Sequence, residues 1–392
     1  MPINNQTINS LRKCIKCGLP ETYETIEFDK QGVCNICKQQ NFKKNKINWT
    51  SRKEMLDELI EEYRGKYEYD CIVPFSGGKD STFTLYYLMK EYNIKPLVVQ
   101  FDHGFMRPNL LENNERTFRK LGVDVISFRP NWKIVKKLMK ESLIRKGDFC
   151  WHCHTGIFSY PMHLAIKYNT PLVLWGEPSS EYTAYYDYQD DEVEEVDETR
   201  FNRFVNLGIT AEDMKGMIED DIDLDYRDLA PYTYPSLRDL KKLRYRSVCL
   251  GSFIPWNVRS QSELITNELG WKGDEVEGVP VDLYPYEKIE CAMQGVRDYI
   301  KYQKRGYGRV TQMTAIDIRN NLITKKEADS YIKEYEGKKP HSLEVFLEYL
   351  NMTEGEFNKI IEKTAVSPYK PNFKNNQFSK RTHDFEKWYR EK

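Results

Sequence analysis

The fold is decided by one short stretch of the chain: Cys71-Ile72-Val73-Pro74-Phe75, followed directly by Ser76-Gly77-Gly78-Lys79-Asp80-Ser81-Thr82. The apolar run predicts a buried strand, the Gly-Gly pair predicts a turn, and the residues after it predict a helix. Glycines leave backbone N–H groups open to an anion, and the N-terminus of a helix attracts negative charge. The stretch therefore predicts a phosphate-binding loop over residues 76–82.

Each polar side chain of this loop has an expected role. The hydroxyls of Ser76, Ser81 and Thr82 would donate to phosphate oxygens, Lys79 would supply a positive charge, and Asp80 would help to hold Mg²⁺. The loop differs from the Walker loop, which has a longer spacer before its Gly-Lys-Ser/Thr. The alternative interpretation is an ordinary Gly-Gly turn capped by Ser and Asp.

Further apolar runs follow this loop, separated by helical patterns. They lie at Pro96–Phe101, Val123–Phe128, Leu172–Trp175 and Ser247–Leu250. Alternation of buried strands with helices predicts an α/β fold with a doubly wound, mostly parallel sheet. Because ligands bind at the carboxyl ends of such strands, we expect Glu177 to point into the crevice, where it would bind Mg²⁺ or sugar hydroxyls. An ordinary carboxylate at a helix start is the alternative.

A separate small module is predicted at the N-terminus. Cys14 and Cys17 form one CxxC pair, Cys34 and Cys37 form a second, and 16 residues lie between the pairs. This spacing is typical of a zinc ribbon, in which four thiolates hold one structural ion. We expect three parts: the ribbon at 1–45, the α/β domain at 46–262 and a mainly helical region at 263–392. The Lys-rich residues 38–46 are expected to be a solvated connector.

Composition narrows the class of protein. The 392 residues suffice for two or three domains of roughly 150 residues each. The 59 Lys and Arg residues nearly cancel the 60 Asp and Glu residues, which disfavours a nucleic-acid partner. No apolar stretch approaches the roughly 20 residues that span a bilayer, and the first 30 residues lack a signal-peptide core. We therefore expect a cytoplasmic protein that is not membrane-bound.

The loop Ser-Gly-Gly-Lys-Asp-Ser resembles the pyrophosphatase loop (PP-loop) of the adenine nucleotide α-hydrolase superfamily, which has an HUP-like fold. Nearly the whole chain resembles the N-acetyl sugar amidotransferase family of surface-polysaccharide and flagellar-sugar pathways. The motifs that carry this resemblance are the cysteine ribbon, residues 74–81, Leu174-Trp175-Gly176-Glu177, Tyr232-Thr233-Tyr234-Pro235, Ile254-Pro255-Trp256, Lys304-Arg305-Gly306-Tyr307-Gly308-Arg309 and Asp317-Ile318-Arg319.

This resemblance implies a reaction that uses ATP and Mg²⁺. An acetamido sugar, nucleotide-linked or free, would be adenylated on its amide oxygen and then attacked by ammonia to give an acetamidino sugar. Ammonia would come from a separate glutaminase similar to the histidine-biosynthesis subunit and its cyclase-like partner, since this chain shows no glutaminase elements of its own. Asp80, Lys79, Glu177 and Arg309 are the expected catalytic residues.

The Gly-rich basic stretch is expected to bind substrate. Lys304 and Arg309 would hold a diphosphate or the AMP leaving group, and Arg319 is a further candidate for substrate binding. The alternative is a solvated run of charges, which is what such stretches often are.

A second group of cysteines contains Cys150 and Cys153, with Cys249 or Cys291 as a distant third ligand. It resembles the iron–sulfur site of tRNA-thiolating members of the superfamily. A 4Fe–4S cluster, a zinc ion that also binds His154, and buried thiols without metal are the three interpretations. Covalent haem at the CxxCH motif is disfavoured in a cytosolic chain with a nucleotide loop.

Two other functions of the whole chain stay open: a sulfurtransferase for tRNA or a small molecule, and a non-catalytic zinc-ribbon scaffold.

Overall fold

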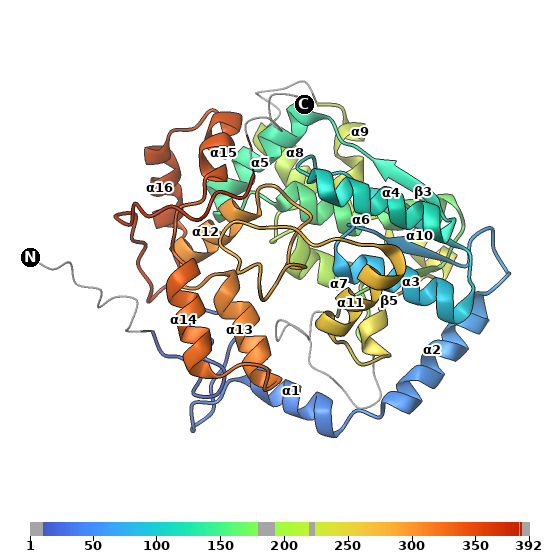
Figure 1. The fold of residues 1–392 in the computed structure, drawn as a ribbon. Helices are drawn as coiled ribbons and strands as arrows, with labels where there is room; N and C mark the ends of the chain where they lie inside the picture. Colours follow the sequence, from blue (N-terminus) through green and yellow to red (C-terminus); the bar gives the residue numbers. More distant parts are fainter. Residues whose placement is uncertain (1–10, 179–192, 219–223, 384, 386–392) are drawn as a thin grey trace, which may run out of the picture.

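The computed structural model describes residues 11–178, 193–218, 224–383 and 385 (Figure 1). Its described strands form one sheet, all parallel, in the order β3-β2-β1-β4-β5. They are β1 (Cys71–Pro74), β2 (Pro96–Phe101), β3 (Asp124–Phe128), β4 (Leu172–Trp175) and β5 (Arg246–Cys249). The predicted parallel α/β sheet is confirmed, and each strand ends within one residue of its predicted bounds.

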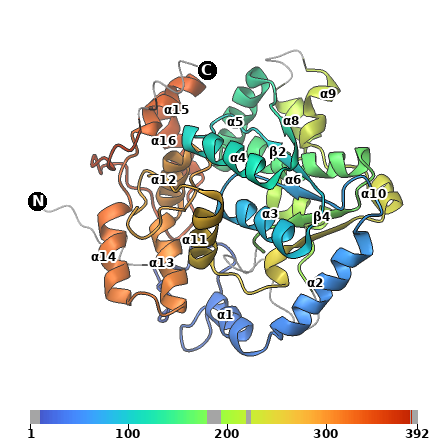
Figure 2. The same cartoon turned by 45° about the vertical axis from the view of Figure 1, so that its right-hand side comes forward.

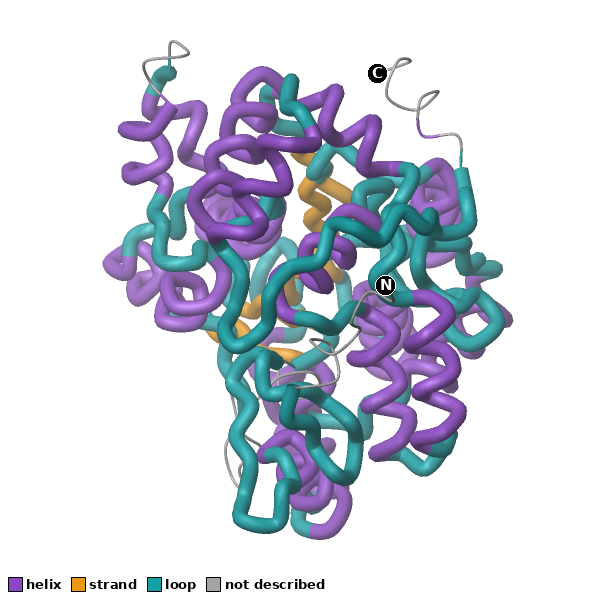
Figure 3. The backbone as a smooth tube through the Cα atoms, turned by 90° about the vertical axis from the view of Figure 1, so that its left-hand side faces the viewer, coloured by secondary structure: helices purple, strands orange, loops and turns teal. Residues whose placement is uncertain are grey.

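Helices enclose this sheet, as the tube in Figure 3 shows. The helices up to residue 270 are α1 (Asn35–Asn45), α2 (Trp49–Tyr63), α3 (Lys79–Tyr92), α4 (Pro108–Leu121), α5 (Trp132–Lys146), α6 (Trp151–Lys167), α7 (Glu198–Arg200), α8 (Ala211–Ile218), α9 (Tyr226–Leu229), α10 (Leu237–Leu243) and α11 (Val258–Leu269). Short π or 3-10 turns lie at Phe201–Val205, Ala230–Tyr232 and Leu250–Ser252.

Each face of the sheet has its own core, because successive residues of a strand point to opposite faces. Val73 of β1 packs in a core with Leu88 of α3 and Ile265 of α11. Its neighbour Ile72 packs in a second core with Ala165 of α6. The central strands β1 and β2 are buried throughout, as expected for strands covered on both faces.

The C-terminal region is mainly helical, as predicted. It contains α12 (Gln294–Arg305), α13 (Arg309–Arg319), α14 (Lys325–Tyr335), α15 (Ser342–Leu350) and α16 (Glu354–Lys363), which gather on one side of the molecule in Figure 1. A third core joins Leu143 of α5 to Val296 of α12, Phe346 of α15 and Ile361 of α16. This core fixes the C-terminal helices against the α/β part of the chain.

Residues 38–46, expected to be a connector, are mostly helix, because α1 begins inside the second CxxC pair and continues to Asn45. Lys44 Nζ donates to the carbonyl of Arg319 at 3.0 Å, so this helix docks on the C-terminal region. Figure 2 shows α1 and α2 following each other below the sheet. The three-part division stays a prediction. Helix α11 crosses its boundary at residue 262, and it packs on α3.

The order of strands places a switch point beside β1. The chain builds β2 and β3 on one side of β1 and then returns to build β4 and β5 on the other. Helices therefore leave β1 and β4 toward opposite faces, which opens a crevice at the carboxyl ends of these two strands. Within the described residues, no helix combines the length and the apolar character that crossing a bilayer requires.

Candidate active site

The loop after β1 is shaped by its own hydroxyls. Ser81 Oγ accepts hydrogen bonds from the N–H groups of Ser76 (3.2 Å) and Gly77 (3.1 Å). Thr82, which is fully buried, donates its hydroxyl to the Gly77 carbonyl at 3.3 Å, and the Trp271 indole donates to the same carbonyl at 3.1 Å. The Thr82 hydroxyl therefore holds the loop in shape, whereas the sequence led us to expect it to donate to a phosphate oxygen.

Two positions of this loop require glycine, because polar side chains from other elements pack directly against its backbone. Gly77 has a φ of +86°, and a Cβ there would also overlap the Asn114 side-chain amide. A Cβ at Gly78 would overlap the Glu290 carboxylate. Asn114 is buried, and neither polar atom of its side chain has a hydrogen-bond partner among the described residues. The backbone of the Gly-Gly turn is therefore approached closely by polar groups from α4 and from the C-terminal region.

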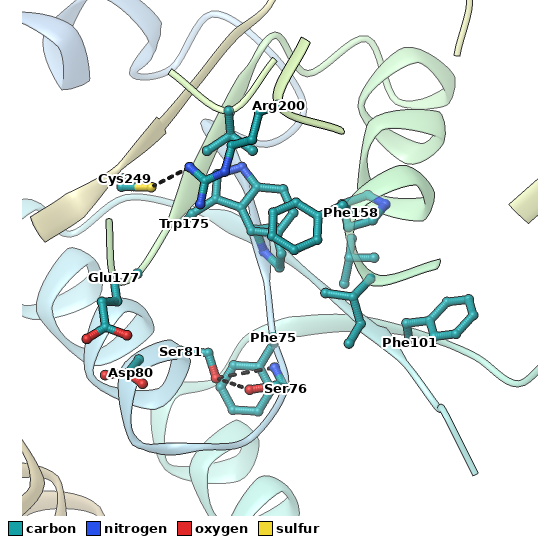
Figure 4. Close-up of a pocket in the computed structure, with 16 residues that line it drawn as sticks. Phe75, Ser76, Asp80, Ser81, Phe101, Phe158, Trp175, Glu177, Arg200 and Cys249 are labelled. Carbon is teal, nitrogen blue, oxygen red and sulfur yellow. Dashed lines mark hydrogen bonds between the residues drawn. The ribbon is translucent and has the colours of Figure 1, made fainter. Parts of the chain in front are cut away.

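A cavity of about 170 Å³ opens beside the loop, over the carboxyl ends of β1, β4 and β5. One wall is aromatic: the rings of Phe158 and Trp175 stack with centroids 4.8 Å apart and an angle of 17° between planes. Ser76 and Ser81 lie across the cavity from these rings in Figure 4. An aromatic wall facing hydroxyls and a helix N-terminus suits a nucleotide, with its base on the rings and its phosphates at the loop.

Two carboxylates line the same cavity, on the side of the loop in Figure 4. Asp80 lies in the first turn of α3, and Glu177 follows β4 after Gly176. Asp80 Oδ2 pairs with Lys79 Nζ at 3.0 Å, whereas the buried Oδ1 has no hydrogen-bond partner among the described residues. Carboxylate oxygens are the ligands that Mg²⁺ prefers, so this pair fits a magnesium ion that also contacts phosphates.

Lys79 lies elsewhere than the sequence led us to expect. Its side chain is only 2% exposed and is not part of the cavity lining. Its Nζ lies 3.1 Å from Oε2 of Glu287, which is fully buried and which also lies 3.4 Å from Arg309 Nη1. Burial alone would raise the pKa of Glu287, but the charges of Lys79, Lys288 and Arg309 outweigh it and lower the pKa to about 2. Lys79 thus orients Asp80 and ties the loop to the C-terminal region.

The other predicted basic residues do not join Asp80 in this cavity. Arg309 pairs with Glu287 and with Asp298 at 3.2 Å. Lys304 Nζ donates to the carbonyls of residues 146 and 147, at the C-terminus of α5. Arg319 is buried at the end of α13, near the N-terminal cysteines. Lys304 and Arg309 line a second cavity instead, which is described below.

The four N-terminal cysteines come together as predicted. Cys14 Sγ lies 3.9 Å from Cys37 Sγ, Cys17 Sγ lies 3.7 Å from Cys34 Sγ, and all four thiols are buried within 4.8 Å of one another. Four such thiols can hold a metal ion. The ribbon packs on the C-terminal region, where the Tyr23 and Tyr307 rings lie 5.1 Å apart.

The second group of cysteines divides in two. Cys150 and Cys153, at the start of α6, share one neighbourhood with Cys291, and burial raises the pKa of all three thiols against the opposing charge of Arg297. Cys249 instead lines the nucleotide-type cavity, with its Sγ 4.0 Å from Arg200 Nη1. In the part of the chain that the structure describes, the ribbon is the one set of three or more such side chains with all ligand atoms within 4.8 Å.

Arg200 was not predicted as a site residue. It lines the cavity, pairs with Glu194 and lies with its guanidinium carbon 5.8 Å from the centre of the Phe158 ring. Its place in the sequence, directly after an acidic run, is typical of a solvated salt bridge, so no sequence signal marked it. Glu287 was missed for a similar reason, because nothing around it in the sequence indicates a partner at Lys79.

Comparisons with known proteins agree with parts of this picture. Residues 283–388 match the family model described as "LPS biosynthesis protein WbpG-like, C-terminal domain". A stretch of 145 residues, 36% of this chain, is 26% identical to the uncharacterised protein MJ1599 of Methanocaldococcus jannaschii. The chain spans about half the length of that relative, 50% of it.

Among solved structures, the chain is similar to the tRNA thiolase NcsA from Methanococcus maripaludis with its 4Fe–4S cluster. The TM-score is 0.32 at 13% identity, over 92% of this chain and 99% of that one. The fold and the loop define an α/β protein with a parallel sheet and a Gly-Gly turn between β1 and α3. The part of the chain after residue 282 is similar to a domain of lipopolysaccharide-biosynthesis proteins.

Proposed function

We propose that this chain is an ATP-dependent N-acetyl sugar amidotransferase that acts in surface-glycan biosynthesis. It would convert the acetamido group of a sugar into an acetamidino group, with ATP split to AMP and pyrophosphate. The observation that carries the proposal is the pair Asp80 and Glu177, which line one cavity with the phosphate loop at the switch point of the sheet. The WbpG-like match of residues 283–388 supports glycan biosynthesis as the context.

The loop would bind the phosphates of ATP. The N-terminus of α3 and the side chains of Ser76 and Ser81 line the cavity in which the triphosphate would bind, and Asp80 and Glu177 would hold the Mg²⁺ that neutralises it. When bound, the metal ion polarises the phosphoryl oxygens and the leaving pyrophosphate. Lys79 would act by orienting Asp80, since the two side chains are paired at 3.0 Å.

The chemistry has two steps that balance in atoms and charge. The amide oxygen attacks the α-phosphorus, the bond from that phosphorus to the bridging oxygen breaks, and pyrophosphate leaves. Ammonia then attacks the former carbonyl carbon, the C–O bond breaks, and AMP leaves with the oxygen while the nitrogen proton goes to solvent. Adenylation is needed because an amide oxygen alone is a poor leaving group. The ammonia would come from a separate glutaminase and its cyclase-like partner.

Zinc is the metal that we propose for the ribbon. A tetrahedral ion with Zn–S bonds of about 2.3 Å separates its sulfurs by about 3.8 Å, close to the separations observed between Cys14 and Cys37 and between Cys17 and Cys34. Four protein ligands leave no open position for a substrate. The role would therefore be structural, holding the ribbon against α12 and α13.

A sulfurtransferase is the second candidate. The observation that favours it is the shared neighbourhood of Cys150, Cys153 and Cys291, three cysteines that would suit an iron–sulfur cluster with one open iron. The near-zero net charge of the chain counts against tRNA as its substrate.

One experiment separates the two candidates. Purified protein is given ATP and Mg²⁺ with either an acetamido sugar and ammonium, or tRNA and sulfide, and pyrophosphate release is followed. UDP-N-acetylglucosamine and free N-acetylglucosamine serve as the first sugars. Stimulation by an acetamido sugar with ammonium supports the amidotransferase. If only the mixture of tRNA and sulfide stimulates pyrophosphate release, the amidotransferase proposal is wrong and the sulfurtransferase takes its place.

A further inference from the structure

A second cavity is lined by Arg309, whose guanidinium also contacts Glu287. Its volume is about 410 Å³, against about 170 Å³ for the cavity at the loop. The end of α5 and the turn after it form one side, α12 forms another, and Glu24 of the ribbon, Leu207 and Arg309 complete the lining. Parts of the chain that are far apart in sequence therefore enclose this space.

Basic side chains dominate the cavity. Helix α12 contributes Arg297, Lys301 and Lys304 at positions i, i+4 and i+7, which fall on one face of a helix. The complete charged lining consists of six basic residues, Lys146, Arg297, Lys301, Lys304, Arg305 and Arg309, and three acidic ones, Glu24, Asp148 and Asp298. The cavity thus carries a formal excess of three positive charges within a protein of net charge −1.

The acidic residues are mostly engaged. Asp298 pairs with Arg309 at 3.2 Å, and Glu24 lies 3.4 Å from Arg305. Asp148 accepts a hydrogen bond from the backbone N–H of Cys150 at 2.7 Å. These contacts account for two of the six cations and leave the α12 face with a surplus of positive charge.

Arg297 lines this cavity without a direct contact to any acidic group of the described residues. Among the described residues its guanidinium has no hydrogen bond and no ion pair within 4.0 Å, although Cys150, Asp148 and Asp298 lie near enough to raise its pKa above the ordinary value in spite of its burial. An arginine offers five N–H donors in a planar fork, so one without direct partners beside a cavity is available to an oxyanion.

Lys301 likewise makes no ion pair within 4.0 Å among the described residues, and Glu24 is the carboxylate whose charge acts on it most. Its Nζ contacts Gln312 Oε1 at 3.2 Å and lies 5.1 Å from the centre of the Tyr307 ring and 5.9 Å from that of Tyr23. Burial lowers the pKa of Lys301 to about 8, because the nearby charges do not compensate for lost solvation. An anion bound in the cavity would favour the charged form of this lysine.

We propose that the second cavity is a binding site for the phosphate or diphosphate group of an organic phosphate, distinct from the ATP loop. A planar guanidinium and several ammonium groups around one space match a polyanion with several oxygens, whereas a single carboxylate would leave most of these charges uncompensated. The identity of the natural occupant rests on the proposed function. If that function holds, the occupant is the diphosphate of a nucleotide-linked sugar. Sugar phosphates share the same chemistry.

The test is titration calorimetry on the full chain with the loop already saturated by a non-hydrolysable ATP analogue. Inorganic pyrophosphate and UDP-N-acetylglucosamine are the probes, and free N-acetylglucosamine is the control ligand. We expect both probes to bind, and Arg297→Gln to weaken each by about tenfold or more, as loss of a charge-assisted contact implies. Arg145→Gln, an exposed change outside the cavity, should bind both probes like the wild type.

Lys301→Gln provides a second variant if Arg297→Gln does not fold, and circular dichroism checks both. Binding of UDP-N-acetylglucosamine without binding of the free sugar identifies the diphosphate as the group recognised. Glucosamine 1-phosphate is titrated as a third probe. If it and pyrophosphate bind but UDP-N-acetylglucosamine does not, the phosphate site stands and its occupant is a sugar phosphate. If the ATP analogue abolishes pyrophosphate binding, or if neither variant weakens it, the proposal is wrong. These readouts need no turnover, so a failure of the amidotransferase reaction would be seen separately.

Discussion

Lys79 and Glu287 form a buried ion pair, with Nζ and Oε2 3.1 Å apart and both side chains at most 2% exposed. Glu287 also contacts Arg309 at 3.4 Å, so one carboxylate joins the phosphate loop to a residue that lines the second cavity. The α/β part and the C-terminal region are therefore held together by charge directly beneath the site, in addition to their shared apolar core.

We expect Glu287→Gln to destabilise the protein by about 3–5 kcal/mol, because it leaves the buried charges of Lys79 and Arg309 without their common partner. Urea unfolding at neutral pH measures this. Glu115→Gln is the matched control, since it breaks an exposed ion pair with Arg119 (2.6 Å), and such pairs contribute about 0–1 kcal/mol. An equal decrease in the free energy of unfolding in the two variants would show that the buried ion pair stabilises the protein no more than an exposed one.

Because of Glu287, we also expect the stability of the folded protein to depend on pH in the acid range. The pKa of Glu287 falls from an ordinary value of 4.5 to about 2 in the folded protein. A lowered pKa means that the stabilisation is complete above pH 4.5 and disappears as the pH falls through 2. The stability difference between wild type and Glu287→Gln should therefore shrink between these values in acid-unfolding experiments. A difference that stays constant down to pH 2 would contradict the assignment.

Asp80→Asn should reduce pyrophosphate release by at least about a hundredfold while the fold persists, because it removes a carboxylate proposed to hold the metal ion and leaves Lys79 its pair with Glu287. Pyrophosphate release and thermal unfolding are measured side by side. Asp239→Asn, an exposed change in α10, serves as the control for activity. Near-normal turnover in Asp80→Asn would refute the role of the loop.

Much of the α/β part could be predicted from local sequence. Strands β1 to β5 and helices α3 to α5 follow apolar periodicity and turn residues, signals that lie within about ten residues of each element. The four ribbon cysteines are close in sequence as well as in space. Residues 38–46 were misjudged, because their polar composition indicated solvent and gave no sign that α1 docks on the end of α13.

The side-chain partners in the site could not be predicted in this way. Lys79 turns from the cavity because Glu287, 208 positions later, lies beneath the loop, and only the packed C-terminal region brings it there. Lys304 binds carbonyls of α5 for the same reason. Arg200 enters the cavity through its pairing with Glu194, a contact that the sequence does not distinguish from an exposed salt bridge. Long-range packing decides each of these positions.

Cys34→Ser should lose the ribbon metal and lower the thermal stability by several degrees or more, since metal binding stabilises such a small module by about 10–16 kcal/mol and the ribbon packs on Tyr307. Elemental analysis and thermal unfolding provide the readouts. Cys249→Ala is the control, because that thiol lines the cavity beside the phosphate loop and is not part of the ribbon. Its loss should leave the metal content unchanged. A stable Cys34→Ser protein that contains no metal would contradict the structural role.

The central claim is tested most directly by pyrophosphate release from ATP by the purified chain, assayed with and without an acetamido sugar and with and without ammonium. We predict pyrophosphate release that requires the sugar, formation of AMP in equal amount, and an amidine product only when ammonium is present. Pyrophosphate release that is unaffected by every acetamido sugar, or no splitting of ATP with any acceptor and nitrogen source, would contradict it.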